Sequence, residues 1–523
     1  MPIPKKLAGL LLSMSLTTGA FAETRMVAFG GGSSPQNDQQ SLLSNVHYFD
    51  RVRKILSLDK TPFEVYFADA GKNAVVQASA KDDEHQQLVN LVGMLLYNSN
   101  STRLRFNKVD RGDIAGEATT ENLAKWFDAT KDKLKPKDRL IFYFTGHGGG
   151  ERFNTVSPRN TTMYMWGKNE GYPMREFVKQ LDKLDPAVET TLIMVQCYSG
   201  GFANVIYKDG DPEKGLSDHL RAGFFSTVAS RMAAGCTPEI DEDDYEEFST
   251  SFFEALCGQS RTGKKVDGAD YDHNGTVTYN EAFAWTVLTS STIDIPVCTS
   301  DQLLRDKSRY FKDGDSAGVL PKEAAWPAVI AAASPSEKAM LEGLSEQLGL
   351  TGDDRLAAAG QMAERLDQEM RPPQMQRGPM NATSRSTTGP TSRPMFNRGQ
   401  NQQQPVDPAR QRLQQAILTR WPQLAIPLSP QAIETLDKEW KEIETTLKAQ
   451  PEYERFANMM KQNRERSDAR QAVELKWVKT QRLLERAASV ILAKNLPQVA
   501  DAATVKAFET LKRMEGGNLN TAE

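Results

Sequence analysis

Two short apolar runs constrain the fold of this chain more than any other feature. The first, residues 139–146, leads into His147, and the second, residues 191–196, leads into Cys197, fifty positions further on. Runs of this length and composition are typical of strands that are buried on both faces, as in parallel sheets. Because the carboxyl ends of parallel strands meet at one edge of an open α/β sheet, we expect both side chains at that edge.

A thiol and an imidazole at the same edge can carry out acyl transfer. An ordinary cysteine has a pKa of about 8.5, so only a small fraction of it is the nucleophilic thiolate at neutral pH. A neighbouring imidazole shifts that balance and handles the proton of the leaving group. Glycines 148–150 follow the histidine and allow the backbone to approach a ligand closely, because they carry no Cβ.

At these residues the sequence resembles the caspase and legumain superfamily of cysteine peptidases, clan CD. That family has a strand ending in His-Gly and, about fifty residues later, a strand ending in Cys followed by small residues. Further strand-like runs at 26–32, 63–67 and 224–230 follow the family's order. The resemblance implies an αβα sandwich with a mostly parallel central sheet. It also implies that Cys197 is the nucleophile and His147 the base and acid, with the N–H groups of Gly148 and Cys197 as the oxyanion hole.

The resemblance also indicates which residues line the substrate groove, namely Val195, Gln196, Asp38 and Ser230. Specificity in the superfamily depends partly on the residue two before the cysteine, here the apolar Val195. The loop after the first strand, which includes Asp38, has no arginine, so a strict aspartate preference is not expected. Because Val195 is apolar and residues 239–247 are acidic, we expect a basic or small uncharged residue at the cleavage position. An acidic run at 239–247 either attracts a basic substrate side chain or is a solvated loop.

Two other readings of these residues deserve comparison. The segment 147–150 also matches the HGGG loop of lipase-like hydrolases, but the Gly-x-Ser-x-Gly elbow those enzymes need is absent, since Cys197 replaces its first glycine before Ser199. The second alternative is a catalytically silent, calcium-stabilised scaffold on a peptidase fold. Retention of both His147 and Cys197 favours the enzyme, whose expected partner is a polypeptide substrate.

A second motif, at residues 270–281, fits the twelve-residue calcium loop. Gly275 permits its sharp turn, and a helix is expected to leave the loop at 282–288. The preceding helix is expected to end near Gly258, so the site is predicted to be a structural clip for Ca²⁺, and the chemistry itself needs no cofactor. The predicted ligands are Asp270, Asp272, Asn274, Thr276, Thr278 and Glu281.

The N-terminus predicts export. Lys5 and Lys6 precede an apolar segment, and small residues at 20 and 22 indicate a signal peptide over 1–22 that is cleaved after Ala22. No later apolar stretch reaches the length of a transmembrane anchor, so a periplasmic or secreted product is expected. The 523-residue chain has a formal net charge of −4, which gives no general attraction to nucleic acid.

Export makes cysteine pairing relevant. Apart from Cys197, the chain has Cys236, Cys257 and Cys298, which allow one disulfide and one remaining thiol. Pairing of Cys236 with Cys298 is favoured, and the other pairings stay open.

Differences in composition divide the mature chain into four segments. Residues 23–312 alternate strand-like and helix-like runs, as expected of the peptidase domain with its calcium loop, and 313–370 read as helical. Residues 371–408 lack apolar periodicity and are expected to be a disordered linker. Residues 409–517 are predicted to form a helical hairpin or coiled coil, because Trp477, Leu484 and Ile491 repeat at seven. This region has four possible roles, namely self-association, docking of a partner, inhibition of the catalytic site, and packing only on itself.

Overall fold

The computed structural model describes residues 22–79, 83–99, 101–150, 159–167, 171–235, 239–240, 245–371 and 408–520. Several sequence-based predictions therefore lie outside the described residues. These are the signal peptide up to residue 21, the linker over 372–407, Cys236 and residues 241–244 of the acidic run.

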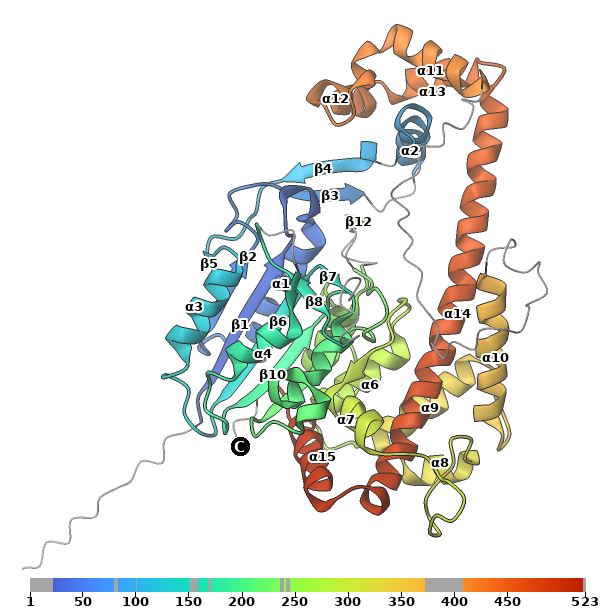
Figure 1. Ribbon diagram of the computed structural model, residues 1–523. Coiled ribbons are helices and arrows are strands. Elements are labelled where there is room, and N and C mark those ends of the chain that lie inside the picture. The colour runs from blue at the N-terminus through green and yellow to red at the C-terminus, as the bar shows by residue number, and fades with distance from the viewer. Residues whose placement is uncertain are drawn as a thin grey trace, which may run out of the picture.

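A seven-stranded sheet in the order β13-β11-β10-β6-β1-β2-β5 forms the centre of the molecule (Figure 1). Neighbouring strands are parallel, apart from the antiparallel pair β11 and β13. The predicted α/β class with a mostly parallel central sheet is confirmed, and the arrangement is compatible with a caspase-like fold. The strands are β1 (Thr24–Gly31), β2 (Phe63–Phe67), β5 (Ile114–Gly116), β6 (Arg139–Gly146), β10 (Glu189–Met194), β11 (Arg221–Phe225) and β13 (Val297–Cys298).

Both faces of this sheet are covered by helices, which explains why its central strands are apolar throughout. Along β6, Ile141 and Tyr143 point to one hydrophobic core, whereas Phe142 and Phe144 point to the other. The first core is completed by α1 (Gln40–Ile55), α5 (Phe248–Cys257) and α6 (Tyr279–Thr289). The second is completed by α3 (Thr120–Thr130), α4 (Met174–Leu181) and α7 (Thr299–Lys307).

One predicted strand is shorter in the structure. The run at 224–230 was expected to be extended throughout, but β11 ends at Phe225. The next residues bond to the turn after β10, because Thr227 N donates to Ser199 Oγ at 3.3 Å and Gly200 N donates to Thr227 O at 2.8 Å. Ser230 therefore lies in a loop.

Two small sheets lie above the carboxyl edge of the large one (Figure 1). One has β12 (Glu239–Ile240), β3 (Val75–Ser79) and β4 (Leu104–Asn107), and α2 (Glu84–Tyr97) connects β3 to β4 in the chain. The other has β7 (Gly148–Gly149), β8 (Thr162–Tyr164) and β9 (Gly171–Pro173), and it begins directly after His147. Short 3-10 helices include η1 (Pro35–Asn37) and η3 (Ser199–Ile206).

The C-terminal half is helical, as predicted. Its helices are α8 (Trp326–Ala332), α9 (Pro335–Gln347), α10 (Arg355–Met370), α11 (Pro408–Arg420), α12 (Pro430–Lys438), α13 (Trp440–Lys448), α14 (Tyr453–Val499) and α15 (Ala502–Glu515). Helices α11, α12 and α13 share a separate hydrophobic core with α2, in which Leu436, Ile443 and Leu447 meet Val92 and Leu95. They sit at the top of the molecule in Figure 1.

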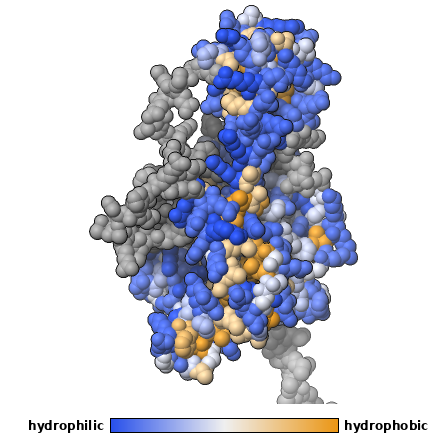
Figure 2. Space-filling view, turned by 90° about the vertical axis from the view of Figure 1, so that its right-hand side faces the viewer, coloured by the Kyte–Doolittle hydropathy of each residue, from blue (hydrophilic) through white to orange (hydrophobic). Residues whose placement is uncertain are grey.

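Helix α14 connects that upper group to the sheet-containing body (Figure 1). Residues 461–472 are exposed on all sides, which is typical of a polar helix that bridges two packed regions. In Figure 2, which faces α14, this middle level is hydrophilic, and apolar side chains gather further down. In the C-terminal part of the helix, Leu483, Val490 and Ile491 are buried and join the first hydrophobic core of the sheet. The start of a separate C-terminal domain at residue 409 stays a prediction. Self-association of the chain through these helices also stays a prediction.

The chain end also contacts the body. Glu515 is fully buried and accepts from Thr299 Oγ1 at 2.9 Å and Ser300 N at 2.8 Å. The guanidinium of Arg139, at the start of β6, donates to Asn518 O at 2.6 Å. None of the described helices combines the length and the apolar character that crossing a membrane requires.

The preferred disulfide is not formed. Cys298 and Cys257 each carry a thiol outside any disulfide, and Cys298 lies at 4% exposure beside Ser300, with Sγ and Oγ 3.3 Å apart. The pairing of Cys236 with Cys298 was therefore wrong. The sequence could not show that Cys298 lies in the last strand of the sheet with its side chain inside the protein.

Candidate functional site

The register of the sheet places His147 and Cys197 at neighbouring strand ends. Strand β10 pairs with β6 at a constant offset of fifty residues, from Glu189 opposite Arg139 to Met194 opposite Phe144. Val195 N extends the ladder by donating to Phe144 O at 3.1 Å. Strand β6 ends at Gly146 and β10 at Met194, so His147 and Cys197 both follow the carboxyl ends of neighbouring parallel strands.

The imidazole of His147 is oriented by a backbone carbonyl. Its Nε2 lies 2.9 Å from Asn37 O in η1, and because a carbonyl only accepts, Nε2 carries the proton. Nδ1 is then the nitrogen that can accept a proton. Burial lowers the pKa of His147, and the hydrogen bond to Asn37 opposes this only in part. The neutral imidazole, which can act as a base, is therefore the favoured form at neutral pH.

The half-buried thiol of Cys197 sits on a tight turn. Tyr198 follows it with a left-handed φ of 61°, an uncommon conformation for a residue with a side chain. Tyr198 N donates to Arg231 O at 2.7 Å, and Ala233 N donates to Cys197 Sγ at 3.3 Å. The loop after β11 thus wraps the cysteine turn, and a backbone amide points at the sulfur.

Gly148 allows the loop after His147 to approach the cysteine turn. A Cβ at this position would lie 2.1 Å from Cys197 O and 2.6 Å from Gln196 Cγ, so no larger residue fits without a shift of the backbone. Tyr164 N donates to His147 O at 2.9 Å, and because strand groups alternate, the N–H of Gly148 points away from β8. We expected the glycines to approach a ligand, but Gly148 approaches the backbone of Cys197.

Asp38 lies next to the carbonyl that orients His147. The side chain is fully buried, and its Oδ1 accepts from Gly32 N at 2.9 Å. Its Oδ2 has no hydrogen-bond partner among the described residues. Burial, together with the nearby charge of Asp69, raises the pKa of Asp38 to about 7 although Gly32 opposes the shift. Asp38 is therefore a buried carboxyl group with one oxygen that no described residue satisfies, adjacent in the chain to the residue whose carbonyl orients the histidine.

The other residues predicted to line the groove differ in accessibility. Val195 is 4% exposed and packs in the first hydrophobic core. Gln196 is fully buried, and neither atom of its amide has a hydrogen-bond partner among the described residues. Ser230 is exposed and directly precedes Arg231.

At the described end of the acidic run, Glu247 lies in the protein interior, whereas Glu246 is exposed. Glu247 is 1% exposed, accepts from Ser249 N at 2.9 Å and lies 3.5 Å from the guanidinium of Arg261. Glu246 accepts from Ser291 N at 3.1 Å. Neither reading of the run, a solvated loop or an attractive surface for substrate, fits Glu247.

Two contributors to the site were not singled out from the sequence. Asn37 acts through its carbonyl oxygen, and Ala233 acts through its amide N–H. Almost any residue type can supply a backbone carbonyl or N–H group, so the sequence contained no signal for these two positions.

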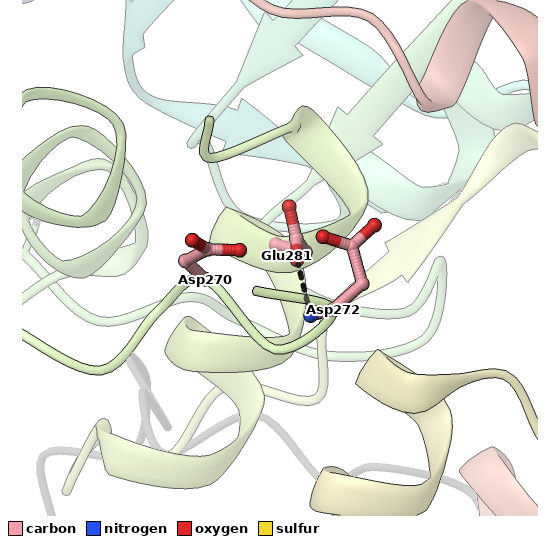
Figure 3. A group of neighbouring side chains, drawn as sticks. All are labelled: Asp270, Asp272 and Glu281. Atoms are coloured by element: carbon pink, nitrogen blue, oxygen red, sulfur yellow. Dashed lines mark hydrogen bonds between the residues drawn. The ribbon is translucent and has the colours of Figure 1, made fainter. Parts of the chain in front are cut away.

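The predicted calcium loop brings three carboxylates together (Figure 3). One carboxylate oxygen from each of Asp270, Asp272 and Glu281 lies within 4.8 Å of the others. Asp272 N donates to Glu281 Oε1 at 3.2 Å, which ties the two ends of the loop to each other. Hard oxygen donors in a compact loop suit Ca²⁺.

The loop backbone is already folded around this group. Asn274 N and Gly275 N donate to the two oxygens of Asp270 at 3.1 and 2.9 Å, and Gly275 has a left-handed φ of 85°. Thr278 caps α6, and its hydroxyl and backbone N both donate to Glu281. Asn274 Oδ1 accepts from Thr276 N at 2.8 Å. The six predicted ligand residues therefore lie in one ordered turn, and α5 ends at Cys257, as the sequence predicted.

Comparison with known proteins adds little to this geometry. No protein-family model matches the chain, and no curated protein is similar to it. The solved structures that are similar over part of it include the following two. One is protein GSU0716 from Geobacter sulfurreducens, with 8% identity, covering 41% of this chain and 76% of that one at a TM-score of 0.23. The other is a secreted C11 cysteine protease from Bacteroides thetaiotaomicron in complex with an irreversible peptide inhibitor, with 14% identity, 42% and 51% coverage and a TM-score of 0.22.

Proposed function

We propose that this protein is a cysteine endopeptidase in which Cys197 is the nucleophile and His147 the general base and acid. The observation that carries the proposal is the register of β6 and β10. The parallel pairing of these neighbouring strands supports a site at their common carboxyl edge, where His147 and Cys197 follow the strand ends. An oriented neutral imidazole beside a nucleophile is the arrangement that activates a thiol.

In the first half of the reaction, Nδ1 of His147 takes the thiol proton and the sulfur of Cys197 attacks the carbonyl carbon of the peptide bond. The tetrahedral intermediate collapses as the C–N bond breaks, and the imidazolium gives its proton to the leaving amine. In the second half, His147 takes a proton from water, which attacks the thioester and releases the acid product. No metal or cofactor takes part in these steps.

The oxyanion of the intermediate needs N–H donors close to the sulfur. The N–H groups of Gly148 and Cys197 are the proposed donors. The contact between the Gly148 position and the Cys197 carbonyl supports this assignment, because it brings the two backbone segments together. A Cβ at position 148 would force them apart, so the proposal requires glycine there.

We propose a basic or small uncharged residue at the cleavage position. Support comes from Asp38, whose buried carboxyl has one oxygen without a partner among the described residues. A cationic substrate side chain near that carboxyl would favour its ionised form and lower its pKa from the raised value. Gln196 and Ser230 are the other proposed groove residues, and Val195 would contribute through packing.

The 270–281 loop is proposed to bind Ca²⁺ and to stabilise the fold. The six candidate ligand residues fit a hard cation, and the glycine turn and capped helix hold them in place. When bound, Ca²⁺ would offset the mutual repulsion of Asp270, Asp272 and Glu281. Because α6 packs against α5 and Tyr279 N donates to Gly517 O at 2.7 Å, the loop also connects to the chain end.

We also propose that the protein is exported after cleavage behind Ala22, on the basic and apolar pattern of residues 5–22. N-terminal sequencing of the protein from its native host tests this directly. A product that begins at Glu23 supports export, whereas one that begins at residue 1 or 2 contradicts it.

The experiment that tests the peptidase assignment is a cleavage profile of the purified protein on a diverse peptide library. We expect hydrolysis after basic or small uncharged residues, and no hydrolysis by the Cys197→Ala variant. Cleavage at the wild-type rate by Cys197→Ala would overturn the mechanism, and a profile dominated by aspartate would overturn the pocket assignment. A correctly folded wild-type protein that cleaves no member would favour the silent scaffold.

A further inference from the structure

Two hydrogen bonds hold the loop that follows β11 against the cysteine turn, and a third ties the loop to Asp294. Ala233 N donates to Cys197 Sγ at 3.3 Å, and Arg231 O accepts from Tyr198 N at 2.7 Å. The next amide, Ala234 N, donates to Asp294 Oδ1 at 2.8 Å. The amide that touches the sulfur is therefore fixed by residues on either side of it.

Arg231 and Asp294, which hold this loop on either side of Ala233, both contact residues of α14. Arg231 donates to Glu474 Oε1 at 2.8 Å and lies 4.8 Å from the centre of the Trp477 ring. Arg482 is 1% exposed and donates to Asp294 O at 2.7 Å and Ser290 O at 2.6 Å. Glu474 and Arg482 are eight residues apart on the helix and so share one face of it.

We propose that α14 positions the Ala233 amide on the sulfur of Cys197, and that Arg231, Glu474 and Arg482 are positioning residues for the thiolate. A backbone N–H that donates to sulfur stabilises the charged form over the neutral one. Contacts made more than 240 residues along the chain thereby set the reactivity of the cysteine. The inference rests on the proposed function only in naming Cys197 as the reactive thiol.

Other charged and titratable groups in this part of the protein also affect the equilibrium between the thiol and the thiolate of Cys197. His147, at the end of β6, donates to Asn37 O, and Asp38 follows Asn37 in the chain and accepts from Gly32 N. Asp294, in the segment before β13, accepts from Ala234 N through its carboxylate and from Arg482 Nε through its backbone carbonyl. Conservative changes at Glu474 leave all of these in place, which makes it the position of choice for a test.

The test measures the pH dependence of alkylation of Cys197 by iodoacetamide in the full chain, with the modified peptide quantified by mass spectrometry. Glu474→Gln removes the charge of the carboxylate but keeps the side-chain size. We expect the midpoint of its profile to rise by roughly one pH unit, which corresponds to losing one hydrogen bond to a charged group. Glu465→Gln, in the exposed segment of the same helix, should keep the wild-type midpoint.

Charge-reversal variants distinguish loss of the specific Arg231–Glu474 contact from a non-specific loosening of the loop after β11. Arg231→Glu and Glu474→Arg should each raise the midpoint, and the double variant should return it toward the wild-type value. An unchanged midpoint in Glu474→Gln would overturn the proposal, as would faster alkylation at every pH, which would mean that the loop shields the sulfur. The assay needs no peptide substrate, so its result is independent of whether the protein cleaves peptides.

Discussion

Nε2 of His147 lies 2.9 Å from the carbonyl oxygen of Asn37 and donates to it, which fixes the tautomer of the imidazole. The ring is held by a backbone carbonyl of the short helix η1. The proton-accepting nitrogen is thus determined by a residue whose side chain plays no part in the contact.

Replacing His147 tests the base. His147→Gln should lower turnover on a cleaved peptide by roughly 10²- to 10⁴-fold, because general-base assistance is lost. Since burial lowers the pKa of His147, the wild-type rate should fall on the acid side only below the ordinary histidine range. A steady-state pH profile measures both effects. His219→Gln, at another part-buried histidine, is the matched control and should retain wild-type turnover. Equal losses in the two variants would contradict the role of His147.

Asp38 should make folding stability depend on pH. Its pKa is about 7 in the folded protein and about 3.8 ordinarily, so the folded state holds the proton more tightly. The stabilising contribution is complete below about pH 4 and is lost as the pH rises through 7. Asp38→Asn stays neutral, so its stability relative to wild type should rise between pH 5 and 8.5, by roughly 2 kcal/mol.

Urea unfolding at the two pH values measures this difference. The exposed Asp132→Asn serves as a control and should show no such trend. A difference between Asp38→Asn and wild type that does not change with pH would show that the Asp38 carboxyl is ionised throughout.

Calcium should raise the melting temperature. An isolated loop of this kind is expected to bind with a Kd on the order of 10⁻⁴ to 10⁻³ M, and a ligand of the folded state stabilises it by RT ln(1 + [L]/Kd). Glu281→Gln should remove most of the shift between millimolar calcium and excess chelator. The exposed Glu346→Gln should keep it. Glu254 is unsuitable as a control, because it accepts from Trp285 Nε1 at 3.0 Å. Identical wild-type melting curves in calcium and chelator would refute the site.

Arg482 should be essential for attachment of α14. Its guanidinium donates to the carbonyls of Ser290, Thr292 and Asp294, and Arg482→Met would leave these buried acceptors without a donor. We expect a loss of roughly 3 to 5 kcal/mol in the free energy of unfolding, measured in urea. Arg470→Met, in the exposed segment of α14, should cost less than about 0.5 kcal/mol. A similar small cost for both would contradict the structural role of Arg482.

The sequence predicted the parts of the site that depend on residue type and local pattern. Apolar runs identified β6 and β10, and their ends placed His147 and Cys197 at one edge. The spacing of oxygen-bearing residues around Gly275 predicted the 270–281 turn, which the structure orders around three carboxylates. These features are local, so a short window of sequence contains them.

The rest depends on contacts between distant residues. Cys298 was assigned to a disulfide because nothing nearby showed its burial, and Glu247 was grouped with a surface run although it lies beside Arg261. The heptad-like repeat through Leu484 and Ile491 indicated a packed helix but not its partner, which is the sheet-containing body. The contact of Arg231 with Glu474 joins segments whose proximity no local pattern encodes.

The most direct test of the central claim is labelling with a peptide that carries a thiol-directed electrophile, followed by mass spectrometry to locate the adduct. We predict a single adduct on Cys197 that is lost in Cys197→Ala, strongly slowed in His147→Gln and unchanged in Cys257→Ala. An adduct that forms equally well in Cys197→Ala, or one carried by Cys257, would contradict the assignment of Cys197 as the nucleophile.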